Sequence, residues 1–116
     1  MNSQYPEIRI DRSWLLERTA LEVAMRLDPF LKEHQKNFPR EKMDERIREY
    51  RLEWARYDGW MMRGMCDILG LQFLHNIVDV HIVSFWMTAM SFPLIIPATY
   101  SPEQFPHTLT HELLHV

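Results

Sequence analysis

Residues 108–116 read Thr-Leu-Thr-His-Glu-Leu-Leu-His-Val and contain the pattern H-E-x-x-H. On an α-helix, residues four apart lie on one face, one turn from each other. His111 and His115 could therefore direct their imidazoles at one metal ion. Glu112 would then lie beside the open side of that ion, where a carboxylate can take a proton from a bound water. The spacing predicts a zinc site in which His111 and His115 are metal ligands and Glu112 is the catalytic base.

The residues around this motif favour a helix with one buried side. Apolar residues recur at the spacing that a buried helix face requires. They are Leu109, Leu113, Leu114 and Val116. Pro106 stands where a helix prefers to begin, in its first turn. The alternative interpretation is an ordinary amphipathic helix end whose histidines are solvated or capping.

Residues 108–116 resemble the active-site helix of the zincin metallopeptidases, and the gluzincins among them. Residues 93–97, Pro-Leu-Ile-Ile-Pro, resemble the edge strand that precedes that helix in the family. The resemblance covers about residues 77–116. It implies a small sheet over the active-site helix, a peptide or protein substrate lying antiparallel to the edge strand, and hydrolysis of the peptide bond by a zinc-activated water. We therefore expect 93–97 to be an exposed edge strand beside the metal site.

The chain departs from the family in lacking a third metal ligand after His115. Catalytic zinc sites ordinarily use three protein ligands. We expect a partner or a segment downstream of Val116 to supply the third ligand, and we expect residues 1–116 alone to be inactive, as an incomplete zincin-like catalytic domain. The rival hypothesis is a non-enzymatic helical interaction or regulatory domain in which the motif is vestigial or accidental.

Length and composition limit the remaining classes. A chain of 116 residues with 47% hydrophobic residues can form a single domain with a real core. The net charge of −3 argues against a nucleic-acid partner. The single cysteine, Cys66, permits no intrachain disulfide, and we interpret it as a small core residue rather than a nucleophile. These features fit a cytoplasmic protein.

Residues 82–102 contain no charged side chain and are long enough to cross a bilayer. Three prolines and several hydroxyl residues interrupt the segment, and no lysine or arginine flanks it closely. We therefore interpret it as buried strands and regard membrane association as unlikely.

Helical signals fill residues 1–70. Residues 13–27 have an apolar stripe, and Asp28-Pro29 predicts a fresh helix start with an end near residue 37. The strongest signal is a seam of apolar residues spaced by three and four. It comprises Met43, Ile47, Tyr50, Trp54, Tyr57 and Met61. Gly70 is a plausible stop. The arginines between 40 and 56 could form a phosphate-binding patch, but interleaved acids favour a charge-balanced exposed face.

Residues 71–116 contain strand signals, followed by the terminal helix that carries the motif. Residues 77–85 alternate in polarity like a half-buried strand, a second strand is expected within 86–96, and 71–75 could form a third. The prediction is an α+β domain over 1–116, with N-terminal helices (1–70), then a small mixed sheet and the motif helix (71–116).

Three further residues are candidate contributors to the metal site. His107 lies one turn before His111, but three histidines on consecutive turns spread over about 12 Å, too far to share a metal. We therefore expect His107 at the helix start as a cap or a surface group. Asp79 and His81 share one face of a predicted strand. They could hydrogen-bond a ligand histidine, but simple alternation favours the interpretation that they belong to a polar outer face of the sheet.

Overall fold

The computed structural model describes residues 5–12, 17–19, 22, 26, 38–84, 89–91 and 93–115. The strands are β1 (Glu7–Arg12), β2 (Ile77–Val83), β3 (Met90–Ser91) and β4 (Leu94–Pro97). The helices are the short η1 (Arg40–Lys42), α3 (Met43–Arg63), the π-turn η2 (Gly64–Ile68) and α4 (Phe105–Leu113). Residues 17–19 are also helical. The predicted helix over 28–37 and much of that over 13–27 lie outside the described residues. The α+β class is confirmed in its general form.

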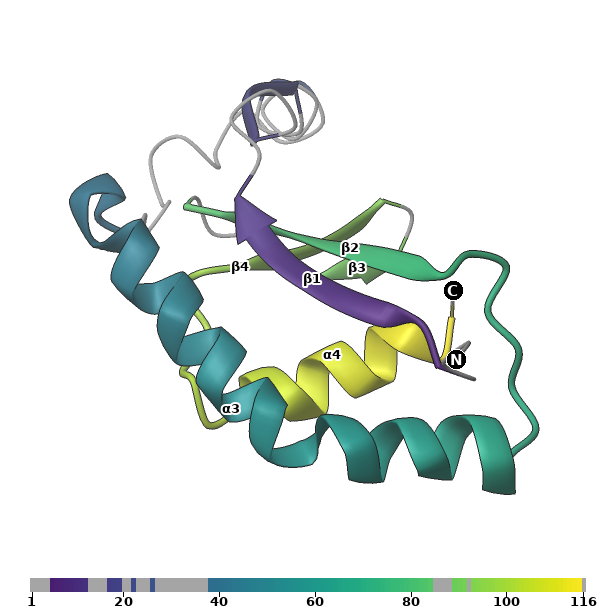
Figure 1. Cartoon of the computed structure of the whole chain (residues 1–116). Coiled ribbons are helices and arrows are strands. Elements are labelled where there is room, and N and C mark those ends of the chain that lie inside the picture. The colour runs from purple at the N-terminus through teal and green to yellow at the C-terminus, as the bar shows by residue number, and fades with distance from the viewer. Residues whose placement is uncertain are drawn as a thin grey trace.

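The sheet has the strand order β1-β2-β4-β3. β1 runs parallel to β2, from the pair Glu7 and Ile77 to the pair Arg12 and Ile82. β2 runs parallel to β4, and the short β3 is antiparallel to β4. The sheet is therefore mixed, and β3 is its outer strand on the side away from β1 (Figure 1).

The helices α3 and α4 pack together against one face of this sheet (Figure 1). The core lies between them and holds Val78, Val80 and Ile82 of β2 with Leu109 and Leu113 of α4. The alternation predicted for residues 77–85 is confirmed over β2, because its odd-numbered residues Ile77, Asp79 and His81 are more exposed than the even-numbered ones between them.

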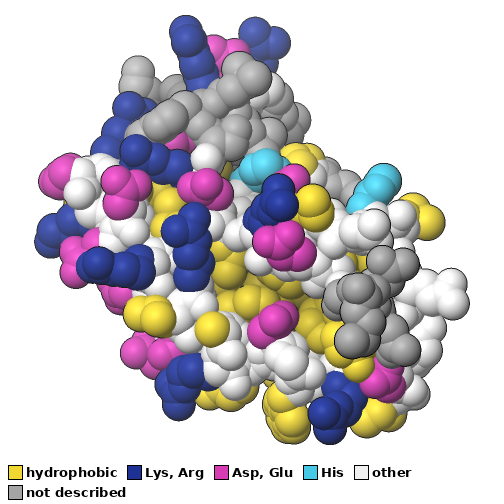
Figure 2. All heavy atoms as spheres, in the orientation of Figure 1, with side chains coloured by type: hydrophobic (Ala, Val, Ile, Leu, Met, Phe, Trp, Pro, Cys, Tyr) yellow, Lys and Arg dark blue, Asp and Glu magenta, His cyan; other side chains and the backbone are white. Residues whose placement is uncertain are grey.

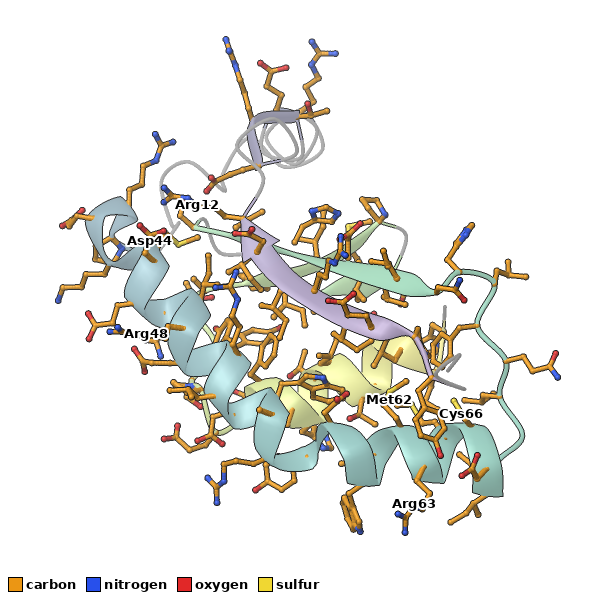
Figure 3. The ribbon with its side chains drawn as sticks, viewed as in Figure 1. Arg12, Asp44, Arg48, Met62, Arg63 and Cys66 are labelled. Carbon is orange, nitrogen blue, oxygen red and sulfur yellow. The ribbon has the colours of Figure 1, made fainter. Side chains whose placement is uncertain are left out.

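The predicted seam of α3 is confirmed over its first three turns and shifts afterwards. Met43, Ile47, Tyr50 and Trp54 are buried. Tyr57 and Met61 are only half-buried, and Met62 is buried in their place. Figure 3 shows Met62 pointing from α3 toward the interior. After the π-turn, Gly70 adopts a φ of 74°, a left-handed conformation that ends the helix as predicted.

Residues 1–70 are not all helical, because β1 lies among them. The segment Glu-Ile-Arg-Ile-Asp-Arg alternates polar and apolar residues with the period of two that a strand requires. Ile10 is buried in the core, and Arg51 of α3 donates a 2.8 Å hydrogen bond from Nε to the Ile10 carbonyl oxygen. Residues 71–75, predicted as a short strand, instead connect η2 to β2 without regular structure.

The prediction that 93–97 is an exposed edge strand is wrong. Ile95 pairs with His81 of β2 on one side and with Met90 of β3 on the other, and all four residues of β4 are buried. The prolines do not prevent this position. Pro93 lies in the turn before the strand and Pro97 is its last residue, so the residues between keep their N–H donors. The edge strand is β3.

Charged side chains of α3 are balanced rather than gathered into a cationic patch. Arg46 lies 3.8 Å from Glu49, and Arg56 lies 3.3 Å from Glu53. Arg12 of β1 and Asp44 of α3 point toward each other at 3.6 Å, and Arg48 points away from the fold (Figure 3). Within the described residues, no helix is long and apolar enough to cross a bilayer.

Candidate metal centre

The helix α4 is held in place by its first turn and by two leucines. Pro106 stands in that first turn, as predicted, and is buried. The ring of Phe105 stacks on Tyr50 of α3 with 4.1 Å between the ring centroids. Leu109 and Leu113 are at most 1% exposed. These contacts fix which side of α4 faces the core, and therefore which residues can face outward.

The loop that leads into α4 is fastened to α3 by the hydroxyl of Tyr50. This hydroxyl lies 2.5 Å from the carbonyl oxygen of Tyr100 and 3.1 Å from that of Pro97, so its proton is shared between two backbone acceptors. Burial raises the pKa of Tyr50 well above its ordinary value of 10.0. The neutral hydroxyl is therefore retained wherever the protein is folded at ordinary pH, and α4 starts from a fixed point.

His111, near the end of α4, and His115, in the turn that follows, are both exposed and lie side by side. Their ring centroids are 5.0 Å apart. Two imidazoles that share a tetrahedral metal at bonds of about 2.1 Å have centroids about 5 Å apart, so the observed spacing fits a common ion. His115 lies in the turn just after α4, where its N–H donates to the carbonyl oxygen of Glu112 at 3.1 Å. This bond keeps the second histidine in register after the helix ends.

Glu112 is 8% exposed, although it lies between two exposed histidines in the sequence. Its Oε2 accepts a 2.5 Å hydrogen bond from the hydroxyl of Ser91 in β3. The Ser91 Oγ also lies 3.3 Å from the Glu112 carbonyl oxygen. No described residue donates a hydrogen bond to Oε1. One carboxylate oxygen is therefore held by the edge strand, and the other accepts no hydrogen bond from the described residues.

A cavity of about 450 Å³ borders Ser91 at the end of the sheet where β2 begins. Apolar residues form most of its wall, including Phe73, Leu74 and Leu94. From β2, the titratable residues Asp79 and His81 also line it. The cavity thus shares Ser91 with the carboxylate site, and no residue of α4 lines it.

The other candidate ligands do not join the two histidines. Among the described residues, no group of three or more His, Cys, Asp or Glu side chains could hold a metal ion. Asp79 and His81 point to the face of β2 opposite the core that α4 shares, so the suggested contact with a ligand histidine is absent there. His107 is exposed, as expected. Cys66 is half-buried, and burial raises the pKa of its thiol, which disfavours a nucleophilic thiolate.

Sequence reasoning missed Ser91 as a contributor to this site. Its strand has only two residues, too short for a period of two to be read. Its contact with Glu112 depends on the antiparallel return of β3 along β4, which no local pattern records. Comparisons with models of known protein families, with curated proteins and with solved structures found no match to this chain.

Proposed function

We propose that this chain forms the catalytic centre of a zinc-dependent peptidase, in which His111 and His115 bind the metal and Glu112 is the general base. The observation that carries the proposal is the arrangement at the end of α4 and in the turn that follows it. Two exposed imidazoles lie at the spacing of a shared ion, and a buried carboxylate stands between them in sequence with one oxygen unbonded by the described residues. The resemblance of residues 108–116 to the zincin helix supports the same chemistry.

Zinc, when bound, would polarise a water molecule and lower its pKa toward neutrality. Glu112 would remove a proton from that water as its oxygen attacks the peptide carbonyl carbon. Glu112 would then give the proton to the amine nitrogen as the carbon–nitrogen bond breaks. His111 and His115 would act only as ligands, through one ring nitrogen each. No additional strong base is needed in this scheme.

The proposed site requires one more protein ligand than the described residues offer. We place its source in a partner or in a further segment of the protein. The exposure of His111 and His115 is compatible with this, because another element can approach them without displacing the core. Until that ligand is supplied, we expect weak zinc binding and no peptide hydrolysis.

A peptide substrate would pair with the side of β3 that no described strand occupies. This strand, and not β4, is the sheet edge that contacts α4, through the bond between Ser91 and Glu112. An extended peptide added there would place its backbone beside the carboxylate. Because Ser91 also borders the apolar cavity, such a peptide would be favoured by an apolar side chain that lies close to β3.

The test is the substitution Glu112→Gln in the protein together with the segment or partner that completes its site. Zinc content by metal analysis should stay equal to that of the wild type, and cleavage of a quenched-fluorescent peptide library should fall by at least roughly 1,000-fold. The matched control is Glu103→Gln, because Glu103 is an exposed carboxylate in the turn before α4. Zinc loss in Glu112→Gln, or full activity, would refute the assigned role.

The rival function, an interaction domain without catalysis, retains one supporting observation. The seam from Met43 to Trp54 cannot be its binding surface, because these side chains face the core of the chain itself. A different apolar surface remains, formed by the exposed side chains of Trp60, Ile68, Leu69 and Leu114. They line a hollow of about 550 Å³ between the end of α3 and α4. Figure 2 shows a separate gathering of hydrophobic side chains within a charged rim, near the middle of the face that it displays. Absence of zinc from the complete protein would favour this rival.

A further inference from the structure

The contact between Ser91 and Glu112 joins the edge strand of the sheet to the motif helix. Ser91 is half-buried, and its hydroxyl lies 2.5 Å from Oε2 and 3.3 Å from the backbone carbonyl oxygen of the same glutamate. A serine hydroxyl carries one proton, so it can donate one strong bond. The distances assign that bond to the carboxylate, because 2.5 Å is typical of a hydroxyl donating to a charged oxygen and 3.3 Å is long.

We propose that Ser91 is a positioning residue for the general base, an inference that rests on the proposed function. Its bond fixes Oε2 and so fixes the plane in which the carboxylate lies. Oε1, to which no described residue donates, is thereby assigned as the atom that receives the proton. Ser91 itself does not touch the reacting atoms in this scheme and exchanges no proton with the substrate.

The location of Glu112 explains why such a contact matters for catalysis. The last turn of a helix frays, and α4 ends at Leu113, one residue after Glu112. A glutamate side chain also has several rotatable bonds, each of which can carry the carboxylate away from a productive position. A rate depends steeply on the placement of a catalytic group, and an error of about 1 Å can cost about 100-fold. An anchor on a neighbouring strand removes both sources of motion.

The test uses the substitutions Ser91→Ala, which deletes the donor, and Ser91→Thr, which keeps a hydroxyl and suits a strand. For Ser91→Ala we expect kcat to fall roughly 10- to 100-fold in the complete zinc-loaded protein, while KM and zinc content stay within about twofold. Ser91→Thr should recover most of kcat. The matched control is Thr99→Val, because the Thr99 hydroxyl is buried and makes no hydrogen bond among the described residues.

A measurement without catalysis separates this inference from the proposed function. In the metal-free protein, the carboxyl ¹³C resonance of Glu112 should shift in Ser91→Ala and return toward the wild type in Ser91→Thr. If Glu112→Gln abolishes hydrolysis but Ser91→Ala keeps kcat within twofold and leaves the resonance unmoved, the positioning role is wrong and the proposed function stands. If Glu112→Gln is fully active, the proposed function fails and the positioning role fails with it.

Discussion

The two helices that cover the sheet, α3 and α4, differ in the kinds of side chain that they bury. In α3 the buried residues are Met43, Ile47, Tyr50, Trp54 and Met62, and its charged residues face outward or pair with one another. In α4 Glu112 is 8% exposed, while Leu114, just past the end of the helix, is 46% exposed. The first helix has the amphipathic pattern expected of a structural element. The second keeps that pattern at Leu109 and Leu113, but it is inverted at Glu112 and Leu114, within the H-E-x-x-H motif.

This inversion has a physical meaning. A buried carboxylate costs stability unless it is hydrogen-bonded, and an exposed leucine contributes little. Natural sequences break local rules mainly where function requires it. The compensation visible here is the single bond from Ser91 to Glu112. The difference between the helices therefore separates a part of the molecule that maintains the fold from a part that we propose carries chemistry.

The largest expected effect belongs to the core of α3. Ile47 is 3% exposed, and Ile47→Ala removes buried methyl groups and leaves a cavity. We expect a loss of about 2–5 kcal/mol in the free energy of unfolding, measured by urea denaturation. Leu52→Ala is the control on the same helix, because Leu52 is 64% exposed and should change stability by no more than about 0.5 kcal/mol. Equal effects at the two positions would contradict the structural assignment of α3.

A smaller effect is expected where α3 meets the loop before α4. Tyr50→Phe keeps the ring that stacks on Phe105 but deletes the hydroxyl near the carbonyl oxygens of Pro97 and Tyr100. Leaving buried acceptors without a donor should cost about 1–3 kcal/mol. The circular-dichroism melting temperature should fall accordingly. A variant as stable as the wild type would show that this hydroxyl does not fasten the loop.

The same substitution makes a prediction about pH. Burial holds the pKa of Tyr50 above its ordinary value of 10.0 in the folded protein, so the unfolded chain loses the proton first. The stabilising contribution is complete below pH 10.0 and declines as the pH rises beyond it, by up to about 1.4 kcal/mol per pH unit. The stability difference between wild type and Tyr50→Phe should therefore shrink above pH 10.0. Parallel pH profiles for the two proteins would contradict this.

The elements that sequence predicted best are those whose signal is local and repeated. The seam of α3 recurs over five turns, so a shift at Met61 and Met62 does not hide it. β2 alternates over seven residues. Pro106 and Gly70 act through their own backbone geometry, in which Pro fixes φ and Gly permits a positive φ. The histidine pair of α4 follows from helical spacing alone.

The elements that sequence missed depend on distant partners. β1 pairs with β2 across some seventy residues, and its alternation includes only Ile8 and Ile10 as apolar positions. β4 is interior because β3 turns back along it, whereas its prolines suggested an edge. The same antiparallel pairing of β3 with β4 brings Ser91 to Glu112. Local propensity cannot record any of these, because long-range pairing decides which strand is central and which is the edge.

The smallest expected effect lies in the histidines of α4. His111 and His115 are both exposed, so His111→Ala and His115→Ala should change the unfolding free energy of the metal-free protein by no more than about 0.5 kcal/mol. In the complete protein, zinc at about 100 times its dissociation constant should stabilise the wild type by about 2.7 kcal/mol, and each substitution should abolish most of that gain. His107→Ala is the control, because this exposed histidine lies in the first turn of the same helix and should leave the zinc-induced gain intact. Chemical denaturation with and without zinc measures both quantities.

A large loss of stability in the metal-free variants would mean that the two imidazoles hold the fold together, as the side chains of α3 do. A zinc-induced gain that survives both substitutions would place the metal elsewhere. The expected result, no cost without zinc and loss of the gain with it, is what distinguishes a metal-binding face from a packing face.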